Sequence, residues 1–238
     1  MPRLPIKIDP CPIDRAVFEI RLASDFSDEI PGLIFPEIKS TYQKWTAPTV
    51  ANIPAGIRES DPNLRFLPTH IYRSECFDLG LGNRVVSLAT AEMDYPGWEI
   101  CAAEIRKILT ALSEHEIIRE VERLGLRYIN FFEEINIWEN LKLTVNLGGE
   151  LIDSQNLHLR NQGMRTPEID QMVEAEDLDC LVHIGHPAYA TLGEEMKVGS
   201  SIDVDVSAFE ITDTNTDVLI GVFERMHTFE KVQFYELL

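Results

Sequence analysis

The sequence predicts an α+β fold, with an N-terminal ferredoxin-like unit followed by a second antiparallel sheet that is packed by a long C-terminal helix. In residues 1–136, strand-like and helix-like patterns follow one another in the order strand, helix, strand, strand, helix, strand, which is the βαββαβ arrangement. Residues 137–238 contain mainly strand-like runs, and a final segment from Asp217 has apolar residues at helical spacing. We therefore expect two domains, 1–136 and 137–238.

The first strand follows a proline-rich arm. Residues 1–14 contain four prolines, which remove hydrogen-bond donors and favour an extended chain. Residues 16–23 then alternate, with Phe18, Ile20 and Leu22 on one side and charged residues on the other. This alternation predicts a half-buried strand.

A helix and a long loop are expected next. Residues 33–45 carry apolar side chains, among them Tyr42 and Trp45, at the spacing of an amphipathic helix. Residues 46–68 contain four prolines and little periodicity, which predicts a long loop. Loops of this length inside compact domains are often functional or mobile.

The rest of the first half supplies a hairpin, a helix and a strand. Residues 71–78 and 84–92 are strand-like, and the glycines between them provide turn chemistry. Residues 94–98 open a helix whose apolar positions continue to Leu112. Residues 121–132 alternate well enough for the closing strand.

The second half is predicted to be a sheet with one helix. Residues 137–147 fit a short helix or a strand, and an acidic linker occupies residues 174–179. Three further segments are strand-like: residues 151–164, 180–190 and 201–211. Asp213 and its neighbours supply capping residues for the final helix. Its apolar stripe consists of Leu219, Val222, Phe223, Met226, Phe229 and Val232. Such a stripe suits packing on the chain's own sheet or in a homodimer.

Composition limits the partners. The chain has 21 Lys+Arg and 40 Asp+Glu, a formal net charge of −19. Nucleic-acid phosphates repel such a chain unless its few cations gather on one face, so the charge favours solubility or a basic protein partner. No apolar stretch is long enough for a membrane helix, and the first residues lack a secretory pattern. We therefore expect a cytoplasmic protein.

The sequence shows no sign of a cofactor. The four cysteines, Cys11, Cys76, Cys101 and Cys180, are far apart and contain no CxxC pair, so we expect reduced thiols rather than a zinc site. No nucleophile-elbow or Walker-type motif is present.

One cluster has metal-like chemistry. His183, His186, Asp203 and Asp205 fall on neighbouring predicted strands, and histidine with carboxylate suits zinc or manganese. Residues three apart on a straight strand point to opposite faces, however, so the two histidines meet one ion only if a bulge lies at Gly185. Two exposed polar edges are the simpler interpretation.

A second candidate lies in the strand 121–132. Arg123 and Arg127 are expected on one face with Gly125, and Tyr128 and Asn130 on the other. The two guanidinium groups could bind a carboxylate or phosphate by donating hydrogen bonds to its oxygens. The alternative is internal pairing, in which the arginines orient one domain against the other. The acidic neighbours considered for that pairing are Glu120, Glu122 and Glu133.

Three segments together resemble a known family. They are Tyr95-Pro-Gly-Trp98, the segment Arg123-Leu-Gly-Leu-Arg-Tyr-Ile-Asn130, and the tail with Ile202-Asp-Val-Asp205, Met226-His227 and Phe234. The chain resembles, over most of its length, a sporadically distributed prokaryotic protein family of unknown function. This resemblance implies no activity and no catalytic residue.

Two functions are therefore expected from different classes. The first is a non-enzymatic protein-binding or scaffolding protein. Within this class we expect the neutralising or accessory component of a mobile-element, toxin–antitoxin or defence system. The patchy occurrence of the family and the acidic charge motivate it. The alternative is a metal-dependent enzyme that uses the His/Asp cluster.

Overall fold

The computed structural model describes residues 8–91, 95–152, 156–162, 177–192 and 195–238. Its first half contains β1 (Ile13–Ala23), α1 (Ile30–Ile38), β2 (Lys44–Thr46), the 3-10 helix η1 (Thr49–Asn52), α2 (Ala55–Ser60), β3 (His70–Arg73), β4 (Phe77–Leu81), β5 (Val85–Thr90), α3 (Trp98–Glu114) and β6 (Glu120–Glu133). Its second half contains the 3-10 helix η2 (Ile137–Glu139), β7 (Val145–Leu147), β8 (Glu150–Ile152), β9 (Leu157–Gln162), β10 (Leu178–Leu192), β11 (Glu195–Ala208) and α5 (Thr216–Leu237). The predicted α+β class is confirmed.

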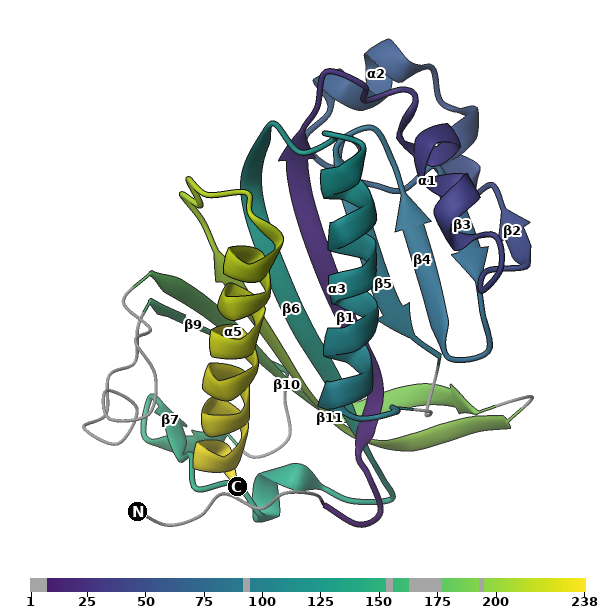
Figure 1. Cartoon of the computed structure of the whole chain (residues 1–238). Coiled ribbons are helices and arrows are strands. Elements are labelled where there is room, and N and C mark those ends of the chain that lie inside the picture. The colour runs from purple at the N-terminus through teal and green to yellow at the C-terminus, as the bar shows by residue number, and fades with distance from the viewer. Residues whose placement is uncertain (1–7, 92–94, 153–155, 163–176, 193–194) are drawn as a thin grey trace.

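One large antiparallel sheet dominates the molecule (Figure 1). Its strand order is β2-β3-β4-β5-β1-β6-β11-β10-β9, and β7 and β8 form a separate pair. The expected second sheet is therefore not separate, because β11 pairs with β6 from Gly199↔Glu133 to Ala208↔Leu124. The strands of residues 137–238 extend the sheet of residues 1–136 across the expected domain boundary.

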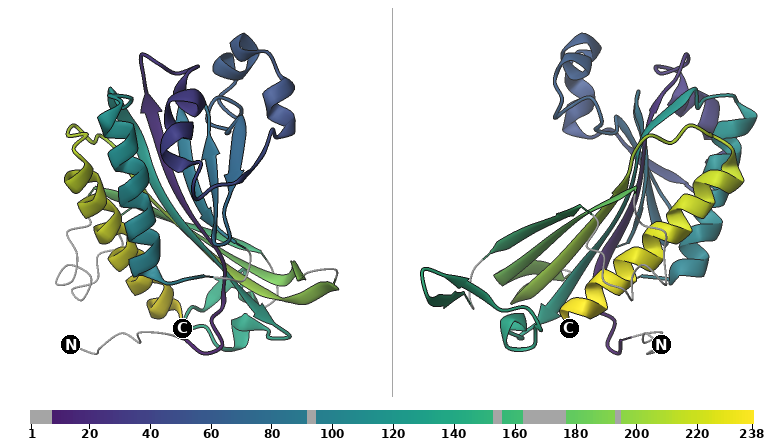
Figure 2. Two further views of the ribbon diagram at one scale, coloured as in Figure 1. Left: turned by 45° about the vertical axis from the view of Figure 1, so that its right-hand side comes forward. Right: turned by 90° about the vertical axis from the view of Figure 1, so that its left-hand side faces the viewer.

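The two faces of the sheet differ in what covers them. Helices α3 and α5 lie side by side on one face, and α1 lies on the same side over the β3–β4 end (Figures 1 and 2). In β1 the side chains of Phe18, Ile20 and Leu22 point to this helix face and are buried. The opposite face is left uncovered by these three helices, and we call it the open face. Its central polar side chains are Arg15, Glu19, Arg21, Arg123, Arg127, Asp203, Asp205 and Ser207.

The first helix is shorter than its pattern predicts. It covers Ile30–Ile38 and ends in a turn in which the Tyr42 backbone N–H donates to the Ile38 carbonyl. Trp45, expected on this helix, instead lies in β2 opposite Tyr72 of β3. Strand pairing thus overrides the helical spacing after Ile38.

The segment predicted as a loop, 46–68, is partly ordered into η1 and α2. Its last residues lie against the open face, because a Cβ atom placed on Gly80 of β4 would come within 3.0 Å of Pro68 Cβ. The segment therefore covers one end of the open face. The first half of the proline-rich arm 1–14, the start of the 94–98 segment and the first half of the acidic linker 174–179 lie outside the described residues.

The C-terminal helix is confirmed. The Asn215 side chain accepts a hydrogen bond from the Asp217 backbone N–H at 2.9 Å and caps its N-terminus. Its apolar stripe is buried against the sheet and α3. In the described part of the chain, this stripe is therefore not exposed for packing against a second copy. Among the described residues, no helix combines the length and apolar character needed to cross a membrane.

The β10–β11 hairpin is irregular in the middle. The register shifts between Gly185 and Ala188, so that His186 and Pro187 face the single residue Ser200 of β11. This extra residue is a β-bulge, and bulges bend strands. Beyond it, the distal part of β10 lies over the open-face side of β6.

Candidate functional site

The strand β6 places its four predicted site residues on two different faces. Arg123 and Arg127 lie on the open face with Gly125, whereas Tyr128 and Asn130 are buried on the helix face. The alternation of a strand explains this separation. The four residues therefore belong to two clusters rather than to one site.

Arg123 folds over the backbone at Gly125. Its guanidinium donates to Glu19 Oε1, to Asp205 Oδ1 at 2.9 Å and to Ser207 Oγ at 2.7 Å. In the ladder, Gly125 is the direct neighbour of Glu19 on β1 and of Ser207 on β11. A glycine is needed here because a Cβ atom would lie only 2.9 Å from Arg123 Cζ. Arg123, with 13% of its side chain exposed, thus joins β1 of the first half to β11 of the second.

Arg127 makes a two-point contact with Asp203. Its Nε donates to Oδ1 at 2.8 Å and its Nη2 donates to Oδ2, which is the bidentate geometry that favours arginine over lysine. These bonds raise the pKa of Arg127. Burial raises the pKa of the Asp205 carboxyl, and the nearby Arg123 and Arg127 oppose this only in part.

The acidic neighbours expected for these arginines have other partners. Glu122 accepts from Arg84, and Glu133 pairs with Lys197 at 3.0 Å. Internal pairing nevertheless occupies both arginines, through carboxylates on adjacent strands. An added carboxylate or phosphate would have to displace Asp203 or Asp205.

Tyr128 belongs to a buried polar cluster between the sheet and the helices. Its hydroxyl lies 3.1 Å from the Tyr95 hydroxyl and 3.2 Å from His227 Nδ1. The His227 ring stacks on Trp98 with centroids 4.2 Å apart. Burial lowers the pKa of His227 to about 4, so the imidazole is neutral at pH 7. One helical turn further, burial raises the pKa of Glu230 to about 8.

Asn130 has a structural contact. Its side-chain amide donates to the Ile202 carbonyl at 3.1 Å and is buried. This bond ties β6 to β11 on the helix face, and it leaves Asn130 remote from the two arginines.

The predicted metal cluster is divided. His183 stacks on His158 of β9, with ring centroids 4.1 Å apart, and its Nε2 is buried without a hydrogen-bond partner. His186 instead lies 2.9 Å from Ser200 Oγ, through Nδ1. The expected bulge is present beside Gly185, but the two histidines still contact different groups. Within the described ranges, no three His, Cys, Asp or Glu side chains are grouped so that they could hold a metal ion.

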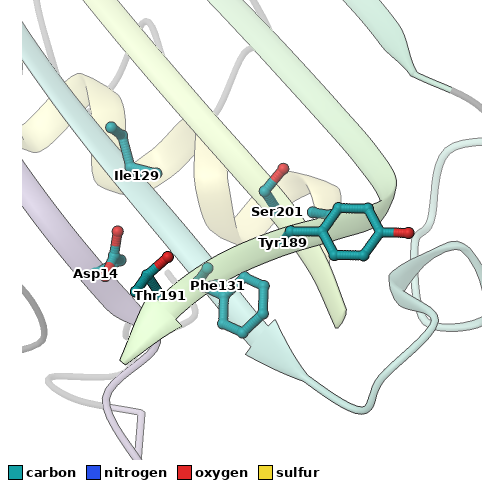
Figure 3. A pocket seen from close by; sticks show the side chains of 8 residues that line it. Asp14, Ile129, Phe131, Tyr189, Thr191 and Ser201 are labelled. Carbon is teal, nitrogen blue, oxygen red and sulfur yellow. The ribbon is translucent and has the colours of Figure 1, made fainter. Parts of the chain in front are cut away.

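A pocket lies beneath the bent part of the hairpin (Figure 3). Its volume is about 370 Å³. The residues that line it are Asp14, Ile129, Phe131, Ala188, Tyr189, Ala190, Thr191 and Ser201. In Figure 3 the Tyr189 ring points away from Asp14 and Thr191, toward the outside. The pocket therefore lies beside an exposed aromatic side chain.

The hairpin end exposes large apolar side chains. Tyr189 is 64% exposed, Met196 72% and Val198 49%. Tyr189 and Val198 are opposite one another in the ladder, and Met196 lies two residues from Val198, so all three share one face of the hairpin. We call these three residues the hairpin surface. Sequence reasoning missed it, although the apolar residues at alternate positions 196 and 198 are a visible signal.

No protein-family model matches the chain, and no curated protein sequence matches it. The resemblance to a sporadically distributed prokaryotic family therefore stays a prediction.

Proposed function

We propose that the chain is a protein-binding protein and that it binds its partner through the hairpin surface. The single observation that carries this proposal is the exposure of Tyr189, Met196 and Val198 together on one face of a projecting hairpin. Contiguous exposed apolar side chains with a polar rim are typical of protein-interaction sites. Tyrosine is also among the residues enriched in the energetic centres of interfaces.

The charges around the hairpin surface favour a basic partner. Lys197 pairs with Glu133 and Glu195, so two carboxylates surround one ammonium group at this end of the molecule. The whole chain has a net charge of −19, which steers a basic protein toward it over a longer range. A basic partner with an apolar centre fits both features.

The alternative, a metal-dependent enzyme, has less support. It requires His183 and His186 to meet one ion beside the carboxylates. Their side chains contact His158 and Ser200 instead, and Asp203 is already bound to Arg127 at two points.

Two finer assignments belong to the same proposal. We interpret β1, β4, β5 and β6, with α1 and α3, as a ferredoxin-like core to which further strands were added on both sides. The adjacency of β4, β5, β1 and β6 in the sheet supports this. A neutralising or accessory role in a mobile-element, toxin–antitoxin or defence system rests on the resemblance and on the acidic charge of the chain.

The experiment compares three forms of the chain expressed in their native host. One is wild type, one carries Tyr189→Ser, Met196→Ser and Val198→Thr, and the control carries Trp45→Ser. Trp45 is 59% exposed on the edge strand β2, so the control removes exposed apolar area elsewhere.

Proteins that co-purify after cross-linking are identified by mass spectrometry. We expect a basic protein that is retained by wild type and by the control, is lost from the hairpin variant, and dissociates as salt is raised. If the hairpin variant retains the same proteins as wild type, or if wild type retains none, the proposal is wrong.

A further inference from the structure

Three arginines surround one phenyl ring at the other end of the open face. Phe66 lies in the segment between α2 and β3. The distances from its ring centroid to the guanidinium carbons are 4.5 Å for Arg21, 4.7 Å for Arg65 and 5.6 Å for Arg84. We call these four residues the Phe66 cluster. In a chain with a net charge of −19, such a concentration of positive charge needs a reason.

The carboxylates beside the Phe66 cluster do not balance it. Glu122 accepts from Arg84. Glu19 Oε1 accepts from Arg21 at 2.7 Å, but the same oxygen also accepts from Arg123. The cluster therefore has three full positive charges, one carboxylate of its own and a share in a second.

The positive charge that no described carboxylate balances is that of Arg65. This residue makes no ion pair with a carboxylate of the described residues, and its Nε is buried without a hydrogen-bond partner. Buried donors are normally satisfied, and an arginine presents five N–H groups in a rigid fork. The face of the Phe66 ring attracts the guanidinium group through a cation–π contact. The ring does not accept hydrogen bonds from the N–H groups that lie in the plane of the guanidinium.

We propose that the Phe66 cluster binds a phosphate-type oxyanion. Several oxygens on one anion can accept from more than one guanidinium at a time, and Arg–phosphate pairs are strong because they are charge-assisted and often bidentate. The anion would satisfy Arg65 and remove the repulsion among the three cations. It is either free phosphate or a phosphate monoester on a larger ligand.

The position of the cluster suits a ligand that arrives from solvent. Arg21 and Arg84 keep 33% and 29% of their side chains exposed. The segment that carries Arg65 and Phe66 is held against the sheet by the contacts of Leu67 and Pro68 near Gly82. The guanidinium groups are thus oriented before an anion binds, which reduces the entropic cost of binding.

The experiment is a thermal-unfolding titration of the full chain with sodium phosphate and, separately, with O-phosphoserine. Sodium chloride at the same ionic strength is the reference, because salt alone changes surface electrostatics. Wild type is expected to show a saturable rise in Tm with phosphate. A larger rise with phosphoserine at equal concentration would identify the monoester as the better ligand, a smaller rise would identify the free anion, and an equal rise would show that the phosphate group alone is recognised.

Two variants test the assignment to Arg65. Arg65→Gln should bind phosphate at least tenfold more weakly, while its Tm without phosphate equals or exceeds that of wild type because a like charge has been removed. Arg65→Lys retains the charge without the fork and should bind with intermediate affinity. The matched control is Arg119→Gln, which removes an arginine paired with Asp25 at an exposed site, and it should respond to phosphate as wild type does.

Some results would overturn the proposal. One is a phosphate response of wild type that does not exceed the response to chloride. Another is an equal response in Arg65→Gln and wild type. The readout involves no protein partner, so the result is independent of the protein-binding function proposed above.

Discussion

The substitution Gly125→Ala tests the contact that joins the two halves of the sheet. A Cβ atom at this position would lie 2.9 Å from Arg123 Cζ and 3.1 Å from Nη2, with Nη1 nearer still. The atoms it meets form the charged end of a side chain, so we expect the guanidinium to move rather than the backbone. Arg123 then loses its contacts with Asp205 and Ser207.

The expected magnitude follows from these contacts. Hydrogen bonds to charged groups contribute about 1.5–3 kcal/mol each, so the loss of two acceptor groups, the Asp205 carboxylate and the Ser207 hydroxyl, costs roughly 3 kcal/mol at the lower end of that range. Glu19 adds little to this loss because Arg21 still donates to it. Alanine is favoured over glycine in a strand by about 0.5–1 kcal/mol, which leaves a net destabilisation of about 2 kcal/mol.

Urea unfolding followed by tryptophan fluorescence measures this change in the free energy of unfolding. The same substitution in a chain that lacks the Arg123 side chain shows whether Arg123 causes it. In an Arg123→Ala chain the space above residue 125 is vacant, so Gly125→Ala should instead stabilise the protein by about 0.5–1 kcal/mol. Such a change of sign gives an interaction energy of roughly 3 kcal/mol between the two positions. Gly221→Ala is the control, because a Cβ atom there meets nothing within 4 Å and should stabilise α5 by up to about 1 kcal/mol. If Gly125→Ala is as destabilising without Arg123 as with it, the reasoning is refuted.

Three further predictions concern buried polar groups. Glu230 has a pKa raised to about 8, so its contribution to stability is full below pH 4.5 and is lost as pH rises through 8; Glu230→Gln should therefore be more stable than wild type above pH 8, with a difference that disappears near pH 4.5. His227 has a pKa lowered to about 4, so its contribution is present above pH 6.5 and is lost as pH falls toward 4; in urea unfolding at a series of pH values, His227→Gln should lack this acid-side loss. Trp138 Nε1 is buried without a hydrogen-bond partner, so Trp138→Phe should leave the free energy of unfolding unchanged or raise it by up to about 1 kcal/mol, and a loss above 2 kcal/mol would contradict this.

The spacing of apolar and polar residues predicted those strands and helices that have one face in the core and the other in solvent. The alternation of Phe18, Ile20 and Leu22 with charged residues predicted β1, because one face of that strand meets helices and the other meets solvent. The same alternation within 121–132 separated Arg127 from Tyr128 correctly. The apolar stripe and the capping segment that begins at Asp213 predicted α5 for an equally local reason.

Contacts that depend on strand order could not be predicted in this way. Arg123 pairs with Glu19, which is 104 positions away in the chain, because β1 and β6 are neighbours in the sheet. His158 belongs to no motif in the sequence, yet it is the residue directly opposite His183 in the sheet. Phe66 lies in a segment without periodicity, so no pattern indicated that three guanidinium groups gather around its ring.

The two proposed sites lie near opposite ends of β1 and should act independently. Asp14 of β1 lines the pocket beneath the hairpin, whereas Arg21 of β1 belongs to the Phe66 cluster. Seven residues of strand correspond to about 23 Å, which exceeds the Debye length of about 8 Å at physiological salt. The hairpin triple variant should therefore keep the wild-type phosphate response, and Arg65→Gln should keep the wild-type protein partner.

A deviation from this independence would have a definite meaning. Substitutions more than about 10 Å apart without shared contacts are normally additive. If Arg65→Gln abolished partner retention, the partner itself would have to span the open face from the Phe66 cluster to the hairpin, and phosphate should then compete with it. Measuring partner retention by wild type at rising phosphate, against chloride of equal ionic strength, separates the two cases. Unchanged retention supports two sites, and loss specific to phosphate supports a single extended interface.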